Sequence, residues 1–348
     1  MTRAPTVSVI MAVYEGATLL PETLASLQAQ TLTDWELIAV DDCSQDDSVA
    51  VLERLGDPRV RVIRSAANGG PVVARNRAFA EARGRYVAGL DQDDISLPER
   101  FVRQVAHLEA HPEVALVSCA TDFLIEGRRL PGNWPRPLTP ELIDWLMLVQ
   151  NPIAWSSVMF RADAARRLDP FERPEMRYVE DFDLYQRLRP HGRIDQIDEV
   201  LMLYRCHAGG ASHVYNGTMR AHAELLLRER HAALLGAAAP DIAGLLVRHV
   251  MARAPVGDVD TLNRLFAGIG VLRAGFAAAN PEVDLAAIDR EISQLWWRVC
   301  RASVRSGDLL LHRTLGSQPL PLGQAADLLA SQMIGGMRKM KRGLTGRG

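Results

Sequence analysis

Cysteine is scarce in this sequence, and its placement argues against two kinds of stabilising site. The four cysteines form no Cys-x-x-Cys pair and lie far apart, at Cys43, Cys119, Cys206 and Cys300. Zinc sites and redox motifs use closely spaced pairs, and disulfide frameworks use a dense set of cysteines. The pattern is typical of reduced thiols, and we therefore expect a cytoplasmic protein.

Long apolar runs and a strong charge of one sign are also missing. No stretch of about 18 apolar residues occurs, so no segment is expected to span a bilayer. The apolar segment near the start is interrupted by Tyr14 and Glu15, which makes it too short to predict a signal peptide. The formal net charge of −2 argues against nucleic acid as a partner.

Two common nucleotide-binding fingerprints are absent as well. The segment after the first predicted strand, 13–18, holds a single glycine, and Asn68-Gly69-Gly70 misses the Gly-x-Gly-x-x-Gly spacing of dinucleotide-binding domains. No Gly-Lys-Ser/Thr sequence of the P-loop type occurs. These absences argue against hydride transfer with a dinucleotide and against P-loop phosphoryl transfer.

Strands and helices alternate over the first part of the chain. Continuous apolar runs predict buried strands over 7–13, 36–40, 60–63 and 86–90, and apolar periodicity predicts helices over 18–30, 47–55 and 71–83. This alternation predicts an α/β fold with a doubly wound, mostly parallel sheet flanked by helices. Ligands of such sheets bind beyond the carboxyl ends of the strands. We therefore expect one crevice where three polar strand ends meet: Tyr14-Glu15, Asp41-Asp42 and Asp91 to Asp94.

The later part of the chain has a different character. Acidic residues outnumber basic ones over 1–216, and the reverse holds from 217 onward. The pattern there is helical throughout, with segments separated by proline or glycine. We expect a first domain over 1–215, a helical domain over 216–336 and a basic tail over 337–348. That tail could contact an anionic membrane, or it could be a solvated end.

The most informative motif is the acidic cluster Asp91-Gln92-Asp93-Asp94 at the end of a predicted strand. Ionised carboxylates this close repel one another unless they are solvated or meet a cation. Hard oxygen ligands suit Mg²⁺ or Mn²⁺, and these ions keep positions open for phosphate oxygens. The cluster therefore predicts a nucleoside-diphosphate site. The alternative is an acidic turn that caps the helix beginning near Pro98.

An ordered series of short motifs resembles the family 2 glycosyltransferases, which have the GT-A fold. The series spans roughly residues 6–212. It comprises 7–14, Val40-Asp41-Asp42-Cys43-Ser44, Ala74-Arg75-Asn76, Asp91-Gln92-Asp93-Asp94, Asn151-Pro152-Ile153, Glu180-Asp181 and the segment His207 to Ser212. The resemblance implies an inverting enzyme that moves a sugar from a nucleotide sugar, with UDP as the expected nucleotide, to an acceptor hydroxyl. The acceptor would be a glycan or a lipid-linked glycan of a bacterial surface polysaccharide.

The resemblance also implies roles for residues on the donor side. The nucleotide pocket would be lined by Ala12, Val13, Tyr14, Glu15 and Gln92. Asp42 would accept a hydrogen bond from the base, Arg75 would reach the diphosphate, and Asp91 would hold the ribose. For Asp41 and Asp42 the alternative is turn chemistry after a strand.

A divalent ion, Mn²⁺ or Mg²⁺, is implied next to these residues. Asp93 would bind it directly and stabilise the leaving nucleoside diphosphate through it. His207 would complete the site, and its imidazole favours Mn²⁺. The alternative for His207 is a surface histidine at a domain junction.

The catalytic base implied by the resemblance is Asp181, at the start of a predicted helix. It would take the proton from the acceptor hydroxyl; the alternative for Glu180 and Asp181 is ordinary stabilisation of a helix start. Trp155 stands where the family often has a different pattern, so Trp155 and Glu180 are candidates for the acceptor side, with Trp155 alternatively a core residue. The segment 128–137 is expected to be a loop over that side. Rival functions are a sugar-phosphate nucleotidyltransferase and a non-catalytic nucleotide- or glycan-binding scaffold.

Overall fold

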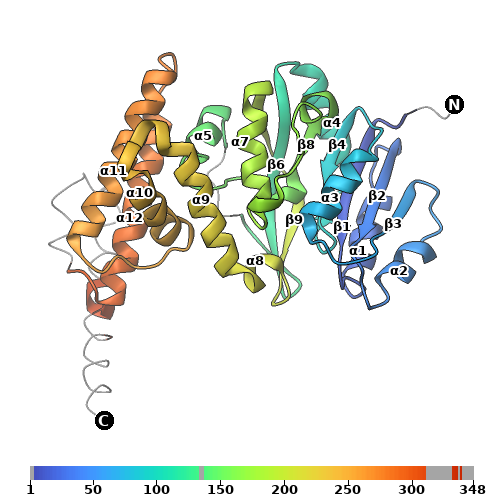
Figure 1. The fold of residues 1–348 in the computed structure, drawn as a ribbon, viewed down its shortest axis with the longest axis horizontal. Helices are drawn as coiled ribbons and strands as arrows, with labels where there is room; N and C mark the ends of the chain where they lie inside the picture. The colour runs from blue at the N-terminus through green and yellow to red at the C-terminus, as the bar shows by residue number, and fades with distance from the viewer. Residues whose placement is uncertain (1–3, 133–136, 311–330, 336–337, 339–348) are drawn as a thin grey trace, which may run out of the picture. The chain divides into compact units, whose positions relative to one another are not determined.

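The computed structural model describes residues 4–132, 137–310, 331–335 and 338, and these form two compact units (Figure 1). The first unit comprises Met1–Ile143 and Asn151–His222, and the second comprises Asp144–Gln150 and Ala223–Gly348. The sequence pattern gave no sign that the short segment Asp144–Gln150 belongs with the later residues. Apart from Arg338, the predicted basic tail lies outside the described residues.

A nine-stranded sheet of order β3-β2-β1-β4-β8-β6-β9-β5, with β7 paired to β6, forms the centre of the first unit. Its first four members are parallel: β1 (Val7–Val13), β2 (Trp35–Asp41), β3 (Val60–Arg64) and β4 (Tyr86–Gly89). These are the predicted strands with small shifts at their ends. Every residue of β2 is buried, as expected of a parallel strand covered on both faces.

The other half of the sheet mixes parallel and antiparallel pairs. It contains β5 (Ile95–Ser96), β6 (Val114–Ile125), β7 (Arg128–Leu130), β8 (Met159–Arg161) and β9 (Arg193–Cys206). Strand β8 is antiparallel to β4 and β6, whereas β6 and β9 are parallel. The expected loop over 128–137 is partly wrong, because it begins with strand β7; residues 133–136 lie outside the described part of the chain.

Helices flank this sheet and are amphipathic where they cover it. The first four are α1 (Leu20–Gln28), α2 (Ser48–Arg54), α3 (Pro71–Ala80) and α4 (Arg100–Ala110). Leu20, Leu24 and Leu27 occupy the buried face of α1, which is the spacing that predicted this helix. Helix α3 packs on β1 and β2, and α4 packs on β6 and β9. Helix α5 (Pro140–Leu146) begins in this unit and ends in the second. The remaining elements of the unit are η1 (Trp155–Ser157), α6 (Ala162–Ala165), η2 (Pro174–Met176), α7 (Glu180–Leu188), η3 (Arg189–His191) and α8 (Ala211–Val214).

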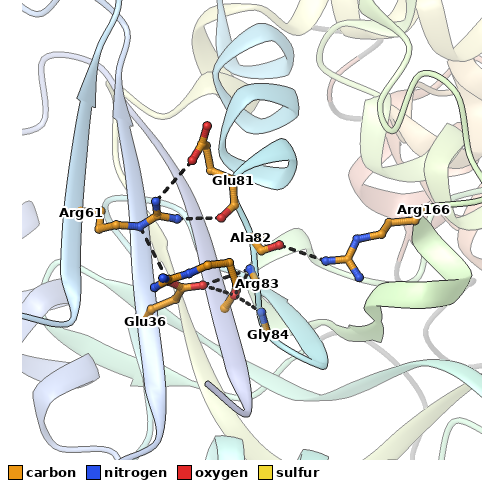
Figure 2. A network of polar contacts seen from close by, with 8 residues as sticks. Glu36, Arg61, Glu81, Ala82, Arg83, Gly84 and Arg166 are labelled. Carbon is orange, nitrogen blue, oxygen red and sulfur yellow. Dashed lines mark hydrogen bonds and ion pairs between the residues drawn. The ribbon is translucent and has the colours of Figure 1, made fainter. Parts of the chain in front are cut away.

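A polar network ties the amino ends of the strands to the turn between α3 and β4 (Figure 2). Glu36, on β2, accepts hydrogen bonds from the Arg83 guanidinium at 2.5 and 3.1 Å and from the Ser8 hydroxyl at 2.7 Å. Burial opposes ionisation here, but these hydrogen bonds prevail and lower the pKa of Glu36. Arg61, on β3, donates to the Glu81 carbonyl at 2.6 Å. The network therefore fixes the edge of the sheet opposite the carboxyl ends, which leaves that other edge for function.

The later residues form helices, as the sequence predicted. They are α9 (Asn216–Leu235), η4 (Gly236–Ala238), α10 (Ala239–Leu245), η5 (Leu246–Met251), α11 (Val259–Ala279) and α12 (Ala286–Ser306). Helix α10 runs directly into η5, which is a π-helix. Within the described residues one continuous helical stretch, Asn216–Met251, has the length and composition of a membrane span, but 44% of its most apolar window is buried inside the protein. Core helices of globular proteins have the same features.

Candidate active site

The acidic turn after β4 is held in place by the end of β9. The backbone N–H of Arg205 donates to Oδ1 of Asp94 at 2.8 Å, and Nε of Arg205 donates to the carbonyl of Asp93 at 2.8 Å. On the other side, the N–H of Asp91 donates to the Ser156 hydroxyl at 2.9 Å. Burial, reinforced by the neighbouring Asp93 and Asp91 charges, raises the pKa of Asp94 well above its ordinary value. Asp94 therefore supports the turn, while its neighbours face the crevice.

Asp93 and His207 face each other across this turn. Nε2 of His207 lies 2.7 Å from Oδ2 of Asp93, and their side chains are 32% and 22% exposed. The sequence placed both residues at one metal site, and the structure brings them together although they lie on different elements. A carboxylate oxygen beside an imidazole nitrogen is a donor set that suits Mn²⁺.

The two side chains fit an ion that is only partly coordinated by protein. No cluster of three or more His, Cys, Asp or Glu suited to a metal occurs in the part of the chain that the structure describes. Mg²⁺ and related ions in phosphate-transfer sites commonly take one or two protein ligands and complete their shell with water and substrate phosphates. Asp93 and His207 meet that requirement, with Asp91 near enough to add negative charge.

Asp181 lies in the first turn of α7 and is held in one orientation. Its Oδ2 accepts a hydrogen bond from the Asn151 side-chain amide at 2.9 Å, and its Oδ1 accepts one from the Phe182 N–H at 2.7 Å. Burial outweighs these bonds and the Arg75 charge, and it raises the pKa of Asp181 above the ordinary 3.8. A desolvated carboxylate with a raised pKa is a stronger proton acceptor than a solvated one. The geometry therefore suits a general base.

Arg75 lies between the acidic turn and α7. Its guanidinium contacts Glu180 and Glu172, the latter at 3.1 Å, and lies 3.5 Å from Asp91. Only 5% of the Arg75 side chain is exposed. Its guanidinium is thus paired with three carboxylates, which leaves it less free to reach the diphosphate than the motif suggested. Glu180, the candidate for the acceptor side, is likewise buried against Arg75.

The surroundings of Asp91 connect the two carboxylate centres. The pKa of Asp91 is raised to about 6, first by desolvation, against the opposing effect of Arg75. The negative charges of both Asp93 and Asp181 add to this increase. Charges act strongly on a neighbour only over short distances. The geometry agrees with this, because the Arg75 guanidinium contacts both Asp91 of the acidic turn and Glu180, the neighbour of Asp181.

The loop after β1 is braced by a glutamine of the acidic turn. The Gln92 side-chain amide accepts from the Tyr14 N–H and donates to the Tyr14 carbonyl, both at 2.9 Å. Glu15 has a φ of 49°, and its carboxylate accepts from the Gln45 N–H at 2.8 Å. Tyr14 is exposed beside Ala12, whereas the Val13 side chain is fully buried. Gln92 thus positions the predicted nucleotide-binding loop. The exposed aromatic ring of Tyr14, on the same loop, is available to a nucleotide.

Asp42 has a structural partner that the sequence did not indicate. Its two carboxylate oxygens accept from the N–H groups of Gly69 and Gly70, at 2.8 and 2.7 Å. Gly70 has a φ of 85°, which favours glycine, and it is the N-cap residue of α3. Asp42 therefore fixes the start of α3, and a contact with a base would use its remaining lone pairs.

Trp155 is a core residue, the alternative that its sequence position left open. Its side chain is 5% exposed, packs against Gly89 and lies below Arg75, with the guanidinium carbon 4.8 Å from the ring centroid. It cannot stack on an acceptor sugar in this arrangement. Sequence reasoning also missed Glu172, which is fully buried beside Arg75, because it lies in none of the matched motifs.

A cavity of about 250 Å³ opens beside Asn151, the residue that holds Asp181. It lies over β6 and β9, and its lining includes Thr121, Asp122, Phe123, Gln196 and Tyr204. The rings of Phe123 and Tyr204 meet edge to face with centroids 6.1 Å apart. An aromatic wall with a few polar groups is the usual composition of a small-molecule pocket.

Comparison with known proteins identifies the family of this site. Residues 8–169 match the model for glycosyl transferase family 2. EpsE of Bacillus subtilis, named as a glycosyltransferase, is 30% identical over 200 residues, which cover 55% of this chain and 69% of EpsE. The chain belongs to glycosyltransferase family 2. Another relative of this glycosyltransferase is the UDP-Glc:alpha-D-GlcNAc-diphosphoundecaprenol beta-1,3-glucosyltransferase WfaP of Escherichia coli, 28% identical over 209 residues, 59% of this chain and 79% of WfaP.

Solved structures show the same fold at lower sequence identity. S. aureus TarS 1-349 in complex with UDP-GlcNAc aligns with a TM-score of 0.56 and 19% identity, over 97% of this chain and 92% of TarS 1-349. The mannosyltransferase PcManGT of Pyrobaculum calidifontis, in complex with GDP-Man and Mn²⁺, aligns with a TM-score of 0.54 and 18% identity, over 95% and 87% of the two chains. The glycosyltransferase therefore has the GT-A fold that the motif series implied, followed by a helical C-terminal region.

Proposed function

We propose that this glycosyltransferase is a metal-dependent inverting enzyme that moves a sugar from a UDP-sugar to an acceptor hydroxyl. The observation that carries the proposal is the Arg75 guanidinium, which contacts both Asp91 of the acidic turn and Glu180, the neighbour of Asp181. A leaving-group site and a base on one crevice permit a single in-line displacement, which inverts the anomeric carbon. The names of WfaP and of the TarS complex support a uridine nucleotide, and the PcManGT complex supports a divalent ion.

Each side chain has a defined task in this proposal. Asp181 accepts the proton of the acceptor hydroxyl, while Asn151 and the Phe182 N–H keep its carboxylate aimed. Mn²⁺ or Mg²⁺ held by Asp93 and His207 would stabilise negative charge on the leaving nucleoside diphosphate. Tyr14 and Glu15 line the base pocket with Ala12, and Asp91 holds the ribose.

The acceptor is proposed to enter the cavity beside Asn151. Its volume of about 250 Å³ suits a group the size of one sugar ring, and the Phe123 and Tyr204 rings offer apolar faces to it. The acceptor class is a glycan or lipid-linked glycan, in line with the diphosphoundecaprenol acceptor in the name of WfaP. We extend the proposal to a cytoplasmic enzyme whose basic segment 337–342 contacts an anionic membrane, and flotation with anionic vesicles tests that part.

The test of the reaction is nucleoside diphosphate release from a panel of UDP-sugars and GDP-mannose, with Mn²⁺ and with EDTA. We expect release from a UDP-sugar in Mn²⁺ and its loss in EDTA. Once an acceptor is found, proton NMR of the product should show the anomeric configuration opposite to that of the donor. Retained configuration, or equal activity in EDTA, would contradict the mechanism. A panel with no turnover but clear nucleotide binding would favour the non-catalytic scaffold instead.

A further inference from the structure

Arg177 lies on the loop between η2 and α7, with its guanidinium directly over the backbone of Gly70. The contact is so close that a Cβ atom at position 70 would overlap the guanidinium group. Gly70 is the residue whose N–H binds Asp42, so Arg177 stands at the predicted nucleotide end of the crevice. The same loop leads within four residues to Asp181. Arg177 was not singled out by any sequence motif.

Unlike the other arginines of the crevice, Arg177 has no carboxylate partner among the residues that the structure describes. Its Nε is buried without a hydrogen-bond partner, and its guanidinium forms no ion pair with any described carboxylate. Arg75 forms ion pairs with Glu172, Glu180 and Asp91. Arg205 forms an ion pair with Glu22 and donates a hydrogen bond to the carbonyl of Asp93. A desolvated guanidinium donor without an acceptor is costly, and such a group marks a place where an acceptor is expected to bind.

The loop holds Arg177 in this position before any ligand arrives. Nδ1 of His222 lies 2.8 Å from the Arg177 carbonyl. Tyr178 has a φ of 71°, an unfavourable conformation for a bulky residue, and its ring stacks on that of Tyr215 with centroids 4.2 Å apart. The Arg177 guanidinium carbon lies 5.4 Å from the Tyr178 ring centroid. A side chain held in this way loses little freedom when it binds.

We propose that Arg177 binds the diphosphate of the nucleotide donor. The proposal rests on the proposed function and gives Arg177 the task that the sequence motif had suggested for Arg75. A guanidinium offers paired N–H donors that match phosphate oxygens. The N–H groups of Gly69 and Gly70 at the start of α3 are already bound by Asp42, so they cannot take that task. Because the loop that carries Arg177 leads directly into the first turn of α7, which carries Asp181, donor binding and base placement would be mechanically linked.

The test is calorimetric titration of the full chain with UDP, UMP and uridine in the presence of Mn²⁺. We expect Arg177→Gln to weaken UDP binding at least tenfold while uridine affinity stays within twofold of the wild type. Arg177→Lys should lose less, because it keeps the charge but not the paired donors. Arg64→Gln is the matched control, since Arg64 forms an exposed ion pair with Glu53 and should leave all three affinities unchanged.

Each result has a defined meaning. Equal loss of UDP and uridine affinity in Arg177→Gln would show a purely structural role and overturn the proposal. Unchanged UDP affinity in that variant, with wild-type binding intact, would overturn it while leaving the proposed function standing. If no nucleoside diphosphate, UDP or GDP, binds the wild type, the proposed function itself fails and this proposal fails with it. A selective loss for UDP relative to UMP would assign Arg177 to the distal phosphate.

Discussion

The side-chain amide of Asn151 donates a hydrogen bond to Oδ2 of Asp181 over 2.9 Å. Asn151 also lines the cavity of about 250 Å³ over β6 and β9, so one side chain touches both the proposed base and the proposed acceptor site. The bond stabilises the ionised carboxylate and lowers the pKa of Asp181 against the larger effect of burial. Asn151 therefore sets both the direction and the proton affinity of the base.

Replacing this amide should move the pH dependence of the reaction. In Asn151→Ala the Asp181 carboxylate loses a donor, so its pKa rises further and the acid limb of the kcat/KM profile shifts to higher pH. We also expect kcat at neutral pH to fall about tenfold, less than the roughly hundredfold cost of losing a general base, because Asp181 keeps its carboxylate. Asn280→Ala is the control, because Asn280 caps α11 with one backbone bond. An unchanged acid limb in Asn151→Ala would contradict the assignment.

The contact between Gln92 and Tyr14 predicts a selective effect on nucleotide binding. Gln92→Glu keeps an acceptor for the Tyr14 N–H but places a carboxylate oxygen against the Tyr14 carbonyl. Losing the donor and adding this repulsion costs about 1–3 kcal/mol, which is roughly ten- to a hundredfold in affinity. Uridine affinity, measured by calorimetry, should fall by that factor. Gln294→Glu, on the exposed face of α12, is the control and should not change uridine affinity. Equal uridine affinities in the two variants would contradict the claim that Gln92 positions the loop after β1.

The buried position of Arg75 predicts a large loss of stability when its charge is removed. Arg75→Met leaves Glu172 and Glu180 buried without their cation, and breaking such a group costs about 3–5 kcal/mol. Arg85→Met is the matched control, because Arg85 pairs with Glu109 at the surface, where an ion pair contributes about 0–1 kcal/mol. Urea unfolding of both variants gives the comparison. Similar losses would show that the Arg75 cluster is solvated.

Glu172 predicts that stability falls as pH rises across the weakly acidic range. Burial raises its pKa from 4.5 to about 7, against the opposing effect of Arg75. The fold therefore favours the protonated form, so its contribution is complete below about 4.5 and is lost as pH rises through about 7. The change is on the order of 3 kcal/mol. Glu172→Gln should flatten this part of the urea stability profile. Glu53→Gln, at an exposed pair, should leave the slope unchanged. An unchanged slope in Glu172→Gln as well would show that Glu172 does not titrate in this range.

Sequence reasoning succeeded where local pattern determines structure. The continuous apolar runs of β1, β2 and β4 and the leucine spacing of α1 predicted those elements, and the comparisons confirmed the family and the fold. Motif order also indicated which side chains to expect at the carboxyl edge of the sheet.

What the sequence could not supply was the partner of each charged group. The Arg75 motif is compatible with a phosphate contact, but the carboxylates that surround it come from Glu172 and Glu180, far along the chain. The sequence likewise left open whether Trp155 lies on the acceptor side or in the core, and its burial in the structure makes it a core residue. Arg177 belongs to no recognisable pattern, because its position depends on a close approach to Gly70 that only coordinates show.

The most direct test of the account compares turnover and nucleotide affinity in Asp181→Asn. The asparagine preserves shape but cannot take a proton, so product formation should fall at least about a hundredfold, as the loss of a general base does. UDP affinity in Mn²⁺ should stay within twofold of the wild type, and Asp47→Asn, an exposed substitution, should change neither quantity. If Asp181→Asn keeps full turnover, Asp181 is not the base and the proposed mechanism is contradicted.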